Sequence, residues 1–198
     1  MKIDLKKEYK SYFSAKPDCI TDSFGEHQYI TMVGSGEPRG ETFTKAVQVL
    51  YAAAYGIKNY CKRQSHDFVV PPLEGLWWVD SSAFFLDTPR SKWQWKLMIM
   101  VPQSVTARIF KDAILETQAK KREIDLTGLK LEKINEGKCI QIMHMGSYHQ
   151  ESETIKRMDE FLKENDLKRN GHHHEIYLSD PNKVAAAKMK TILRQPVK

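Results

Sequence analysis

The sequence predicts an α+β fold in which two β-α-β-β modules, related by a pseudo-twofold axis, form one curved antiparallel sheet. Two observations lead to this prediction: the hydrophobic period alternates between strand and helix values, and the order of the elements repeats. We expect helices on one face of the sheet and a ligand cleft on the other face. A length of 198 residues suits one domain, residues 1–198. Its half-modules are expected at about 20–104 and 125–198, linked by a helix at about 105–121.

The first half is predicted to contain three strands and one long helix. In residues 1–20, Tyr9, Tyr12 and Phe13 have helical spacing, which is typical of a short docking arm. The strands are favoured by β-branched and aromatic residues, and the helix by apolar residues at every third or fourth position. These elements are strand 26–33, helix 43–61, strand 73–79 and strand 93–101.

The second half repeats this order after the linking helix. Its predicted elements are a hairpin of strands 129–134 and 138–145, a helix at about 150–165, and strands 172–178 and 189–193. Asn135-Glu136-Gly137 is the expected hairpin turn. Ser147 followed by Gln150 fits a capping box at the start of the helix.

Composition narrows the function classes. The formal net charge is +6, but the Lys and Arg residues are dispersed among Asp and Glu, so direct nucleic-acid binding is not expected. No apolar run is long enough to cross a membrane, and the N-terminus lacks the apolar core of a signal peptide, which favours a cytoplasmic protein. Three widely spaced cysteines indicate reduced thiols. A monomer without a cofactor is expected.

Neither a metal site nor a hydrolase triad is indicated. His172 and His174 would face one side of a strand and His173 the other, which leaves too few ligands for zinc. The segment Gly146-Ser147-Tyr148 lacks the pattern of a nucleophile elbow.

The candidate site starts from strand 172–178. Side chains alternate along a strand, so Glu175 and Tyr177 share one face while Ile176 and Leu178 share the other, which belongs under a helix. Glu175 then faces either water, as on an edge strand, or a cleft. A buried carboxylate is costly unless it is paired or used.

Aromatic residues supply the second part of the candidate site. Trp77 and Trp78 should point to opposite faces of one strand, whereas Trp93 and Trp95 should share a face. Each tryptophan alone is as consistent with core packing as with a ligand site. Taken together, these four residues, with Tyr177, predict a ligand-binding aromatic cleft, because aromatic faces attract cations and flat polarised rings. Tyr148 is expected there as a second catalytic group beside Glu175, and His144 as a ligand contact.

The C-terminal run from Gly171 to Val197 resembles the signature of the GyrI-like small-molecule-binding proteins. It reads GHHHEIYLSDP followed by KMKTILRQPV, and HMGSY at 144–148 and LEGLWW at 73–78 support the likeness. The resemblance implies the pseudo-twofold fold, shared with the multidrug-binding domains of MerR-type and AraC-type regulators. In those domains an acidic residue meets cationic drugs, and it falls on Glu175 here. No DNA-binding domain is expected beside this one, as in stand-alone members.

Three functions follow from this resemblance. The first is hydrolysis of the cyclopropane ring of DNA-alkylating antibiotics, a detoxification in which Glu175 activates water and Tyr148 or Tyr177 donates to the dienone carbonyl. The second is non-catalytic binding of a planar aromatic or cationic drug or metabolite. The third is inhibition of DNA gyrase by protein contact, against which the positive net charge argues if DNA mimicry were the mechanism.

Overall fold

The computed structural model describes residues 2–81 and 85–198, so residues 82–84 of the predicted first half-module lie outside the described residues. Within the described residues, the chain forms the predicted β-α-β-β order twice. The first half contains β1 (Ile20–Ser35), α2 (Glu41–Arg63), β2 (Leu73–Trp78) and β3 (Gln94–Met100). The second contains β4 (Lys130–Met145), α4 (Glu151–Glu164), β5 (His173–Tyr177) and β6 (Lys190–Pro196), and α3 (Ala107–Lys120) connects the halves.

The remaining elements are short. They are α1 (Leu5–Glu8) and the 3-10 turns Phe85–Asp87, Arg90–Lys92, Tyr148–Gln150 and Ala186–Lys188. Ser147 and Gln150 form the predicted capping box before α4. No described helix is both long and apolar enough to cross a membrane.

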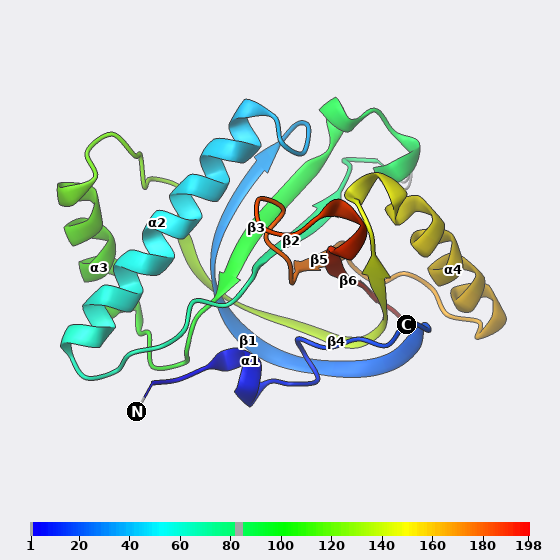
Figure 1. The fold of residues 1–198 in the computed structure, drawn as a ribbon, viewed down its shortest axis with the longest axis horizontal. Coiled ribbons are helices and arrows are strands. Elements are labelled where there is room, and N and C mark those ends of the chain that lie inside the picture. Colours follow the sequence, from blue (N-terminus) through cyan, green and yellow to red (C-terminus); the bar gives the residue numbers. More distant parts are fainter. Residues whose placement is uncertain (1, 82–84) are drawn as a thin grey trace.

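All six strands pair antiparallel in one closed, strongly curved sheet with the order β1-β3-β2-β5-β6-β4. The two halves meet at β2 and β5, where Gly75 lies opposite Glu175, and again along β1 and β4. Figure 1 shows α2 over one half of the curved sheet, α4 over the other, and α3 outside α2. The curved α+β sheet is therefore confirmed.

The predicted hairpin at 129–145 is wrong. The whole segment is one strand, β4, which pairs with β1 on both sides of Gly137. Gly137 adopts φ +64°, a left-handed conformation that suits glycine, yet the chain does not reverse there. The register continues through this point, with Phe24 opposite Gly137 and Glu26 opposite Asn135.

Hydrophobic side chains fill both faces of the sheet. On the helix-bearing face, α2 and α3 cover Trp95, Leu97 and Ile99, while α4 covers a separate cluster with Ile140 and Ile142. On the other face, Leu76, Met98 and Ile176 pack against the N-terminal segment. Ile176 and Leu178, which are expected to lie under a helix, are covered by neither α2 nor α4. The N-terminal segment covers their face, with Leu5 of the short helix α1 beside Tyr12 and Phe13.

A network of charged side chains is buried beneath this N-terminal segment. His174 lies between two carboxylates, with Nδ1 2.8 Å from Glu136 Oε1 and Nε2 3.0 Å from Glu74 Oε2. Arg194 Nη1 donates to Glu136 Oε2 at 2.9 Å, and its Nη2 donates to the Tyr12 carbonyl at 2.7 Å. The Tyr12 hydroxyl donates to Glu74 Oε2 at 2.5 Å. The network thus ties the predicted docking arm to the sheet of its own chain.

Candidate functional site

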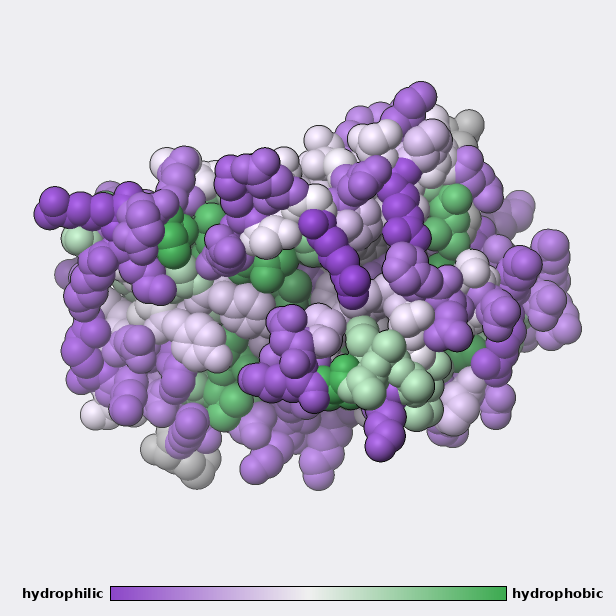
Figure 2. All heavy atoms as spheres, turned by 45° about the horizontal axis from the view of Figure 1, so that its top comes forward, coloured by the Kyte–Doolittle hydropathy of each residue, from purple (hydrophilic) through white to green (hydrophobic). Residues whose placement is uncertain are grey.

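A cavity of about 780 Å³ opens between α2 and α4, over the seam where β2 meets β5. Its volume is in the range typical of small-molecule sites. The strands contribute Leu73, Trp77, Glu175 and Tyr177, α2 contributes Phe43, Val47, Tyr51 and Tyr55, and α4 contributes Glu151, Ser152 and Ile155. Figure 2 looks onto this side, where pale and green side chains lie between purple charged ones.

The position of this cavity corrects the predicted cleft, which was expected on the face without helices. The cavity lies on the same face as α2 and α4. The reason is that each helix covers the sheet of its own half, so the seam between the halves is left uncovered. The opposite face is already filled by the N-terminal segment.

Glu175 lies in the cavity wall with only 6% of its surface exposed. Its Oε2 accepts a hydrogen bond of 2.7 Å from the Tyr177 hydroxyl, which accepts one of 3.1 Å from Trp77 Nε1. Burial raises the pKa of Glu175 to about 7, although the bond from Tyr177 acts in the opposite direction. A pKa near the working pH suits a general base.

Gly75 makes room for this chain of hydrogen bonds. A Cβ atom added at Gly75 would lie 3.0 Å from Trp77 Nε1 and 3.1 Å from the Tyr177 hydroxyl. A larger residue on β2 would therefore push apart the two groups that orient the Glu175 carboxyl group.

Aromatic rings from both halves form the walls. Phe43 stacks on Trp77 with ring centroids 5.7 Å apart, and Trp93 contacts Trp77 edge-on at 5.7 Å. Tyr148 contacts Tyr177 edge-on at 5.7 Å. Burial raises the pKa of Tyr148 to about 12, so its hydroxyl stays protonated. Among the described residues this hydroxyl makes no hydrogen bond, so it can serve a ligand.

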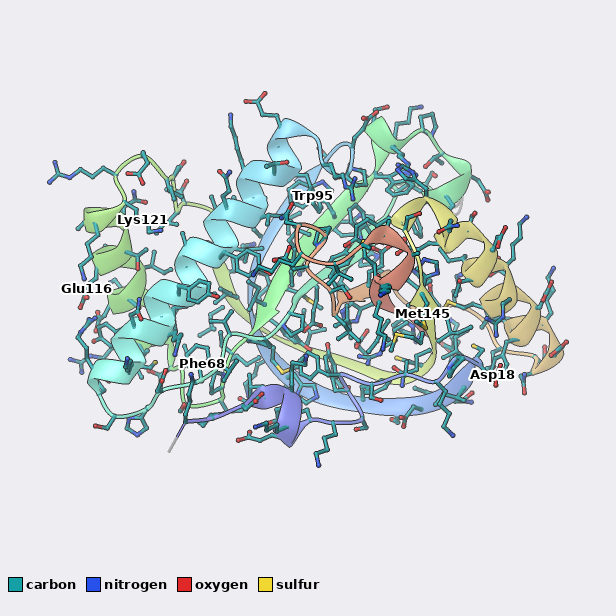
Figure 3. The ribbon with its side chains drawn as sticks, in the orientation of Figure 1. Asp18, Phe68, Trp95, Glu116, Lys121 and Met145 are labelled. Atoms are coloured by element: carbon teal, nitrogen blue, oxygen red, sulfur yellow. The ribbon has the colours of Figure 1, made fainter. Side chains whose placement is uncertain are left out.

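Three residues predicted to contact the ligand do not line the cavity. Trp78 points to the opposite face of β2 and stacks on His172 at 4.3 Å. Trp95 shares the helix-bearing face with Trp77, but it is 1% exposed because α2 and Gly34 cover its ring. Figure 3 shows Trp95 close to the first turns of α2.

His144 is the third residue outside the cavity. It is buried between β4 and α4, where its Nδ1 is 2.8 Å from Thr154 Oγ1 and its Nε2 is 3.1 Å from the Ser147 carbonyl. Both ring nitrogens are thus engaged in holding the turn before α4, and His144 does not face the cavity.

A second carboxylate, Glu151 at the start of α4, also lines the cavity and was not predicted. It is 7% exposed, and its Oε1 has no hydrogen-bond partner among the described residues. Burial raises the pKa of Glu151 well above its ordinary value, and the negative charge of Glu175 raises it further. An acidic residue in the first turn of a helix is usually a solvated partner of the helix dipole, so its sequence position gave no reason to expect burial.

Two arginines at the cavity were also not predicted. The guanidinium of Arg39 lies 5.4 Å from the centre of the Tyr148 ring, and that of Arg90 lies 5.6 Å from the centre of the Trp93 ring. Arg90 lowers the pKa of both Glu151 and Glu175, but burial outweighs this effect.

The described residues contain no group of three or more His, Cys, Asp or Glu side chains arranged to hold a metal ion. The three consecutive histidines separate as a strand requires. His172 stacks on Trp78, His173 stacks on Phe85 at 5.3 Å, and His174 belongs to the network on the other face.

The model of the GyrI-like small molecule binding domain matches residues 29–198. The chain therefore belongs to the GyrI-like family. The matched range contains the cavity-lining residues of α2, β2, α4 and β5, whereas Lys6 of α1, which also lines the cavity, precedes it.

Two solved structures from Listeria innocua are similar over the full length of both chains. One, described as an uncharacterized conserved protein, is 39% identical with a TM-score of 0.93. The other, described as a hydrolase, is 38% identical with a TM-score of 0.90. The C-terminal domain of EcmrR shares the fold at 8% identity and a TM-score of 0.58, over 91% of this chain and 97% of that one. No curated protein matches the sequence.

Proposed function

We infer that this GyrI-like domain binds flat aromatic, cationic or polarised small molecules and hydrolyses the cyclopropane ring of DNA-alkylating antibiotics. One observation carries the proposal: a carboxyl group with a pKa of about 7, that of Glu175, lies in the wall of an aromatic cavity. The similar protein from Listeria innocua that is described as a hydrolase supports the catalytic part.

Aromatic side chains would hold the ligand by its faces. Trp77 and Trp93 approach from the first half, and Tyr148 and Tyr177 from the second. Each aromatic face contributes roughly 0.5 to 2 kcal/mol to the binding of a cation. Glu175 provides the negative charge that a cationic ligand requires.

In the hydrolytic step, Glu175 removes a proton from water while the water oxygen attacks the cyclopropane methylene carbon. The strained C–C bond breaks, and its electron pair moves through the ring to the dienone carbonyl, which becomes a phenolate. Tyr148 donates a hydrogen bond to that oxygen, and a proton from solvent completes the phenol. General-base assistance of this kind contributes about 10² to 10⁴ in rate.

Incubation with a cyclopropane-bearing compound of the duocarmycin type tests this mechanism. Mass spectrometry should detect a product heavier by one water, and Glu175→Gln should lower the rate at least ~100-fold while folding is retained. Glu123→Gln, at an exposed position outside the cavity, is the matched control and should keep the wild-type rate. Equal rates for Glu175→Gln and the wild type would exclude Glu175 as the base.

Non-catalytic binding is the alternative function. It is favoured by the hydrogen bond from Tyr177, which holds the Glu175 carboxyl group as a fixed counter-charge. In that case planar cations should quench tryptophan fluorescence to saturation, and no hydrated product should form.

A further inference from the structure

Two buried carboxyl groups, those of Glu151 and Glu175, lie in the wall of the cavity. Both Glu151 and Glu175 are more than nine-tenths buried, and both line the same cavity. Glu175 accepts a hydrogen bond from Tyr177, whereas Oε1 of Glu151 has no partner among the described residues. An unpartnered buried carboxylate oxygen is costly, so the cavity is built to receive either a proton or a positive charge at this point.

We propose that Glu151 and Glu175 act together as one acidic site and that a planar monocation binds there in exchange for a proton. This inference rests on the binding function proposed above and adds its regulation by pH. The expected ligand is a permanently charged ring system, because its positive charge replaces that of the released proton.

The mutual electrostatic effect has a definite direction. The negative charge of Glu175 raises the pKa of Glu151, and burial raises the pKa of both groups. Without a cation, these effects favour the protonated form of Glu151. A cation placed against the pair has the opposite effect on both groups, so it favours loss of that proton to solvent.

Neighbouring groups keep a constant charge while the pair titrates. The pKa of His173 on β5 is lowered to about 3 by burial, so this residue is neutral above pH 5. Burial raises the pKa of Tyr148 to about 12 and that of Tyr177 well above its ordinary value. His174, which points to the other face of β5, stays protonated below pH 8 because its pKa is about 9.

The charged groups at the mouth are exposed. They are Lys6, Arg39, Arg90, His149 and Asp180. Backbone hydrogen bonding to Asn182 lowers the pKa of Asp180, which therefore remains ionised. Replacing His149 by Gln removes the one imidazole at the mouth, so the experiment uses His149→Gln as its background.

Reciprocal linkage sets the expected size of the effect. If binding releases one proton, the affinity for a permanent cation rises by up to about tenfold per pH unit below the pKa of the group that loses it. Burial raises the pKa of both groups, so the affinity should still be rising at neutral pH. The released proton is measurable independently of affinity, because it is taken up by the buffer.

Ethidium, a planar cation without a titrating group in this range, is a suitable probe. Its dissociation constant is measured by fluorescence from pH 5.5 to 8.0. Calorimetry in phosphate and in Tris, whose ionisation enthalpies differ, counts the protons released. We expect the affinity to rise at least ~10-fold over this range with net proton release. The uncharged 9-anthracenemethanol should show no such rise.

Two variants of α4 distinguish the effect of the Glu151 carboxyl group from the effect of the overall charge of the helix. Glu151→Gln should displace the pH dependence to lower pH and reduce the proton count, because Glu175 then ionises without a carboxylate neighbour. Glu153→Gln removes a charge from the same helical turn, at an exposed position outside the cavity, and should behave like its background.

Each contrary outcome has a distinct meaning. Ethidium binding with an affinity independent of pH and no proton release would overturn the exchange and leave cation binding intact. A pH profile unchanged by Glu151→Gln would overturn the role of Glu151. Absence of ethidium binding at every pH, in protein whose circular dichroism is native, would overturn the proposed cation-binding function itself.

Discussion

Replacing His174 by Gln should weaken the pH dependence of stability above pH 6.5. The side chain is fully buried between Glu74 and Glu136, and these carboxylates raise its pKa from 6.5 to about 9. A shift of this size corresponds to about 3 kcal/mol of folding free energy, since one pKa unit is worth ~1.4 kcal/mol. Because the folded pKa is raised, this stabilisation is complete below pH 6.5 and is lost as the pH rises through 9.

The measurement is urea unfolding followed by tryptophan fluorescence at several pH values between 6 and 9.5. The free energy of unfolding of the wild type should fall across this range by about 3 kcal/mol more than that of His174→Gln. At pH 6 the variant should be less stable by about 3 to 5 kcal/mol, because two buried carboxylates lose their shared cation. The positive charge of His174 also lowers the pKa of Glu175, so the difference reports His174 together with its effect on Glu175.

Two further variants keep this reasoning open to refutation. Glu74→Gln combined with His174→Gln replaces one ion pair by neutral side chains of similar size, leaves the Glu136–Arg194 pair in place, and provides a folded reference if the single variant does not fold. His172→Gln, in the same histidine run but exposed, should change stability by less than about 1 kcal/mol. A difference between wild type and His174→Gln that stays constant from pH 6 to 9.5 would refute the assignment of a buried imidazolium.

Two close approaches of glycine give further predictions. A Cβ added at Gly34 would lie 2.2 Å from the Trp95 ring, so Gly34→Ala should destabilise the protein by about 1 to 3 kcal/mol in thermal unfolding; a change below 0.5 kcal/mol would contradict this contact. A Cβ added at Gly56 would lie 2.0 Å from Thr117 Oγ1, where α2 meets α3. Gly56→Ala should therefore be destabilising by a similar amount, and Thr117→Ala should partly restore stability in the double variant; additive losses would exclude this clash.

The parts of the fold that depend on local periodicity could be predicted from the sequence. The helix expected at 43–61 lies within α2, and both strand-helix-strand-strand series occur in the predicted order. The alternation that placed Glu175 and Tyr177 together is also local, and both side chains line the cavity. Such features follow from neighbouring residues alone, because the period of a strand fixes which side chains share a face.

The hairpin failed because a local turn signal was overridden by distant contacts. Asn-Glu-Gly is typical of a turn, but Glu136 is held by His174 and Arg194 from β5 and β6. His174 and Arg194 are 38 and 58 residues from Glu136 along the chain. Continuing β4 through Gly137 keeps residues 130–141 paired with β1, so both backbone hydrogen bonding and the buried ion pairs favour an uninterrupted strand.

The sequence did not predict which face of the sheet holds the cavity, or that Glu151 lines it. Both depend on packing between the two halves, which no local pattern encodes. Glu151 and Glu175 come from the second half, whereas Phe43, Trp77 and Trp93 come from the first. Neither half alone would desolvate the two acids. Their raised pKa values therefore arise only when β2 and β5 join, and the chemistry of the site is a property of this seam.

The seam also explains why the repeated fold has an asymmetric site. Gly75 lies directly opposite Glu175, and its missing side chain leaves space for the bond between Trp77 and Tyr177. An acidic group on β2 as well would add a further like charge to a buried cavity that already holds Glu151 and Glu175, and that charge would be costly. β5 therefore carries the acid, Glu175, while β2 provides space at Gly75 and the indole donor of Trp77. The two modules share a fold but contribute different groups to the site.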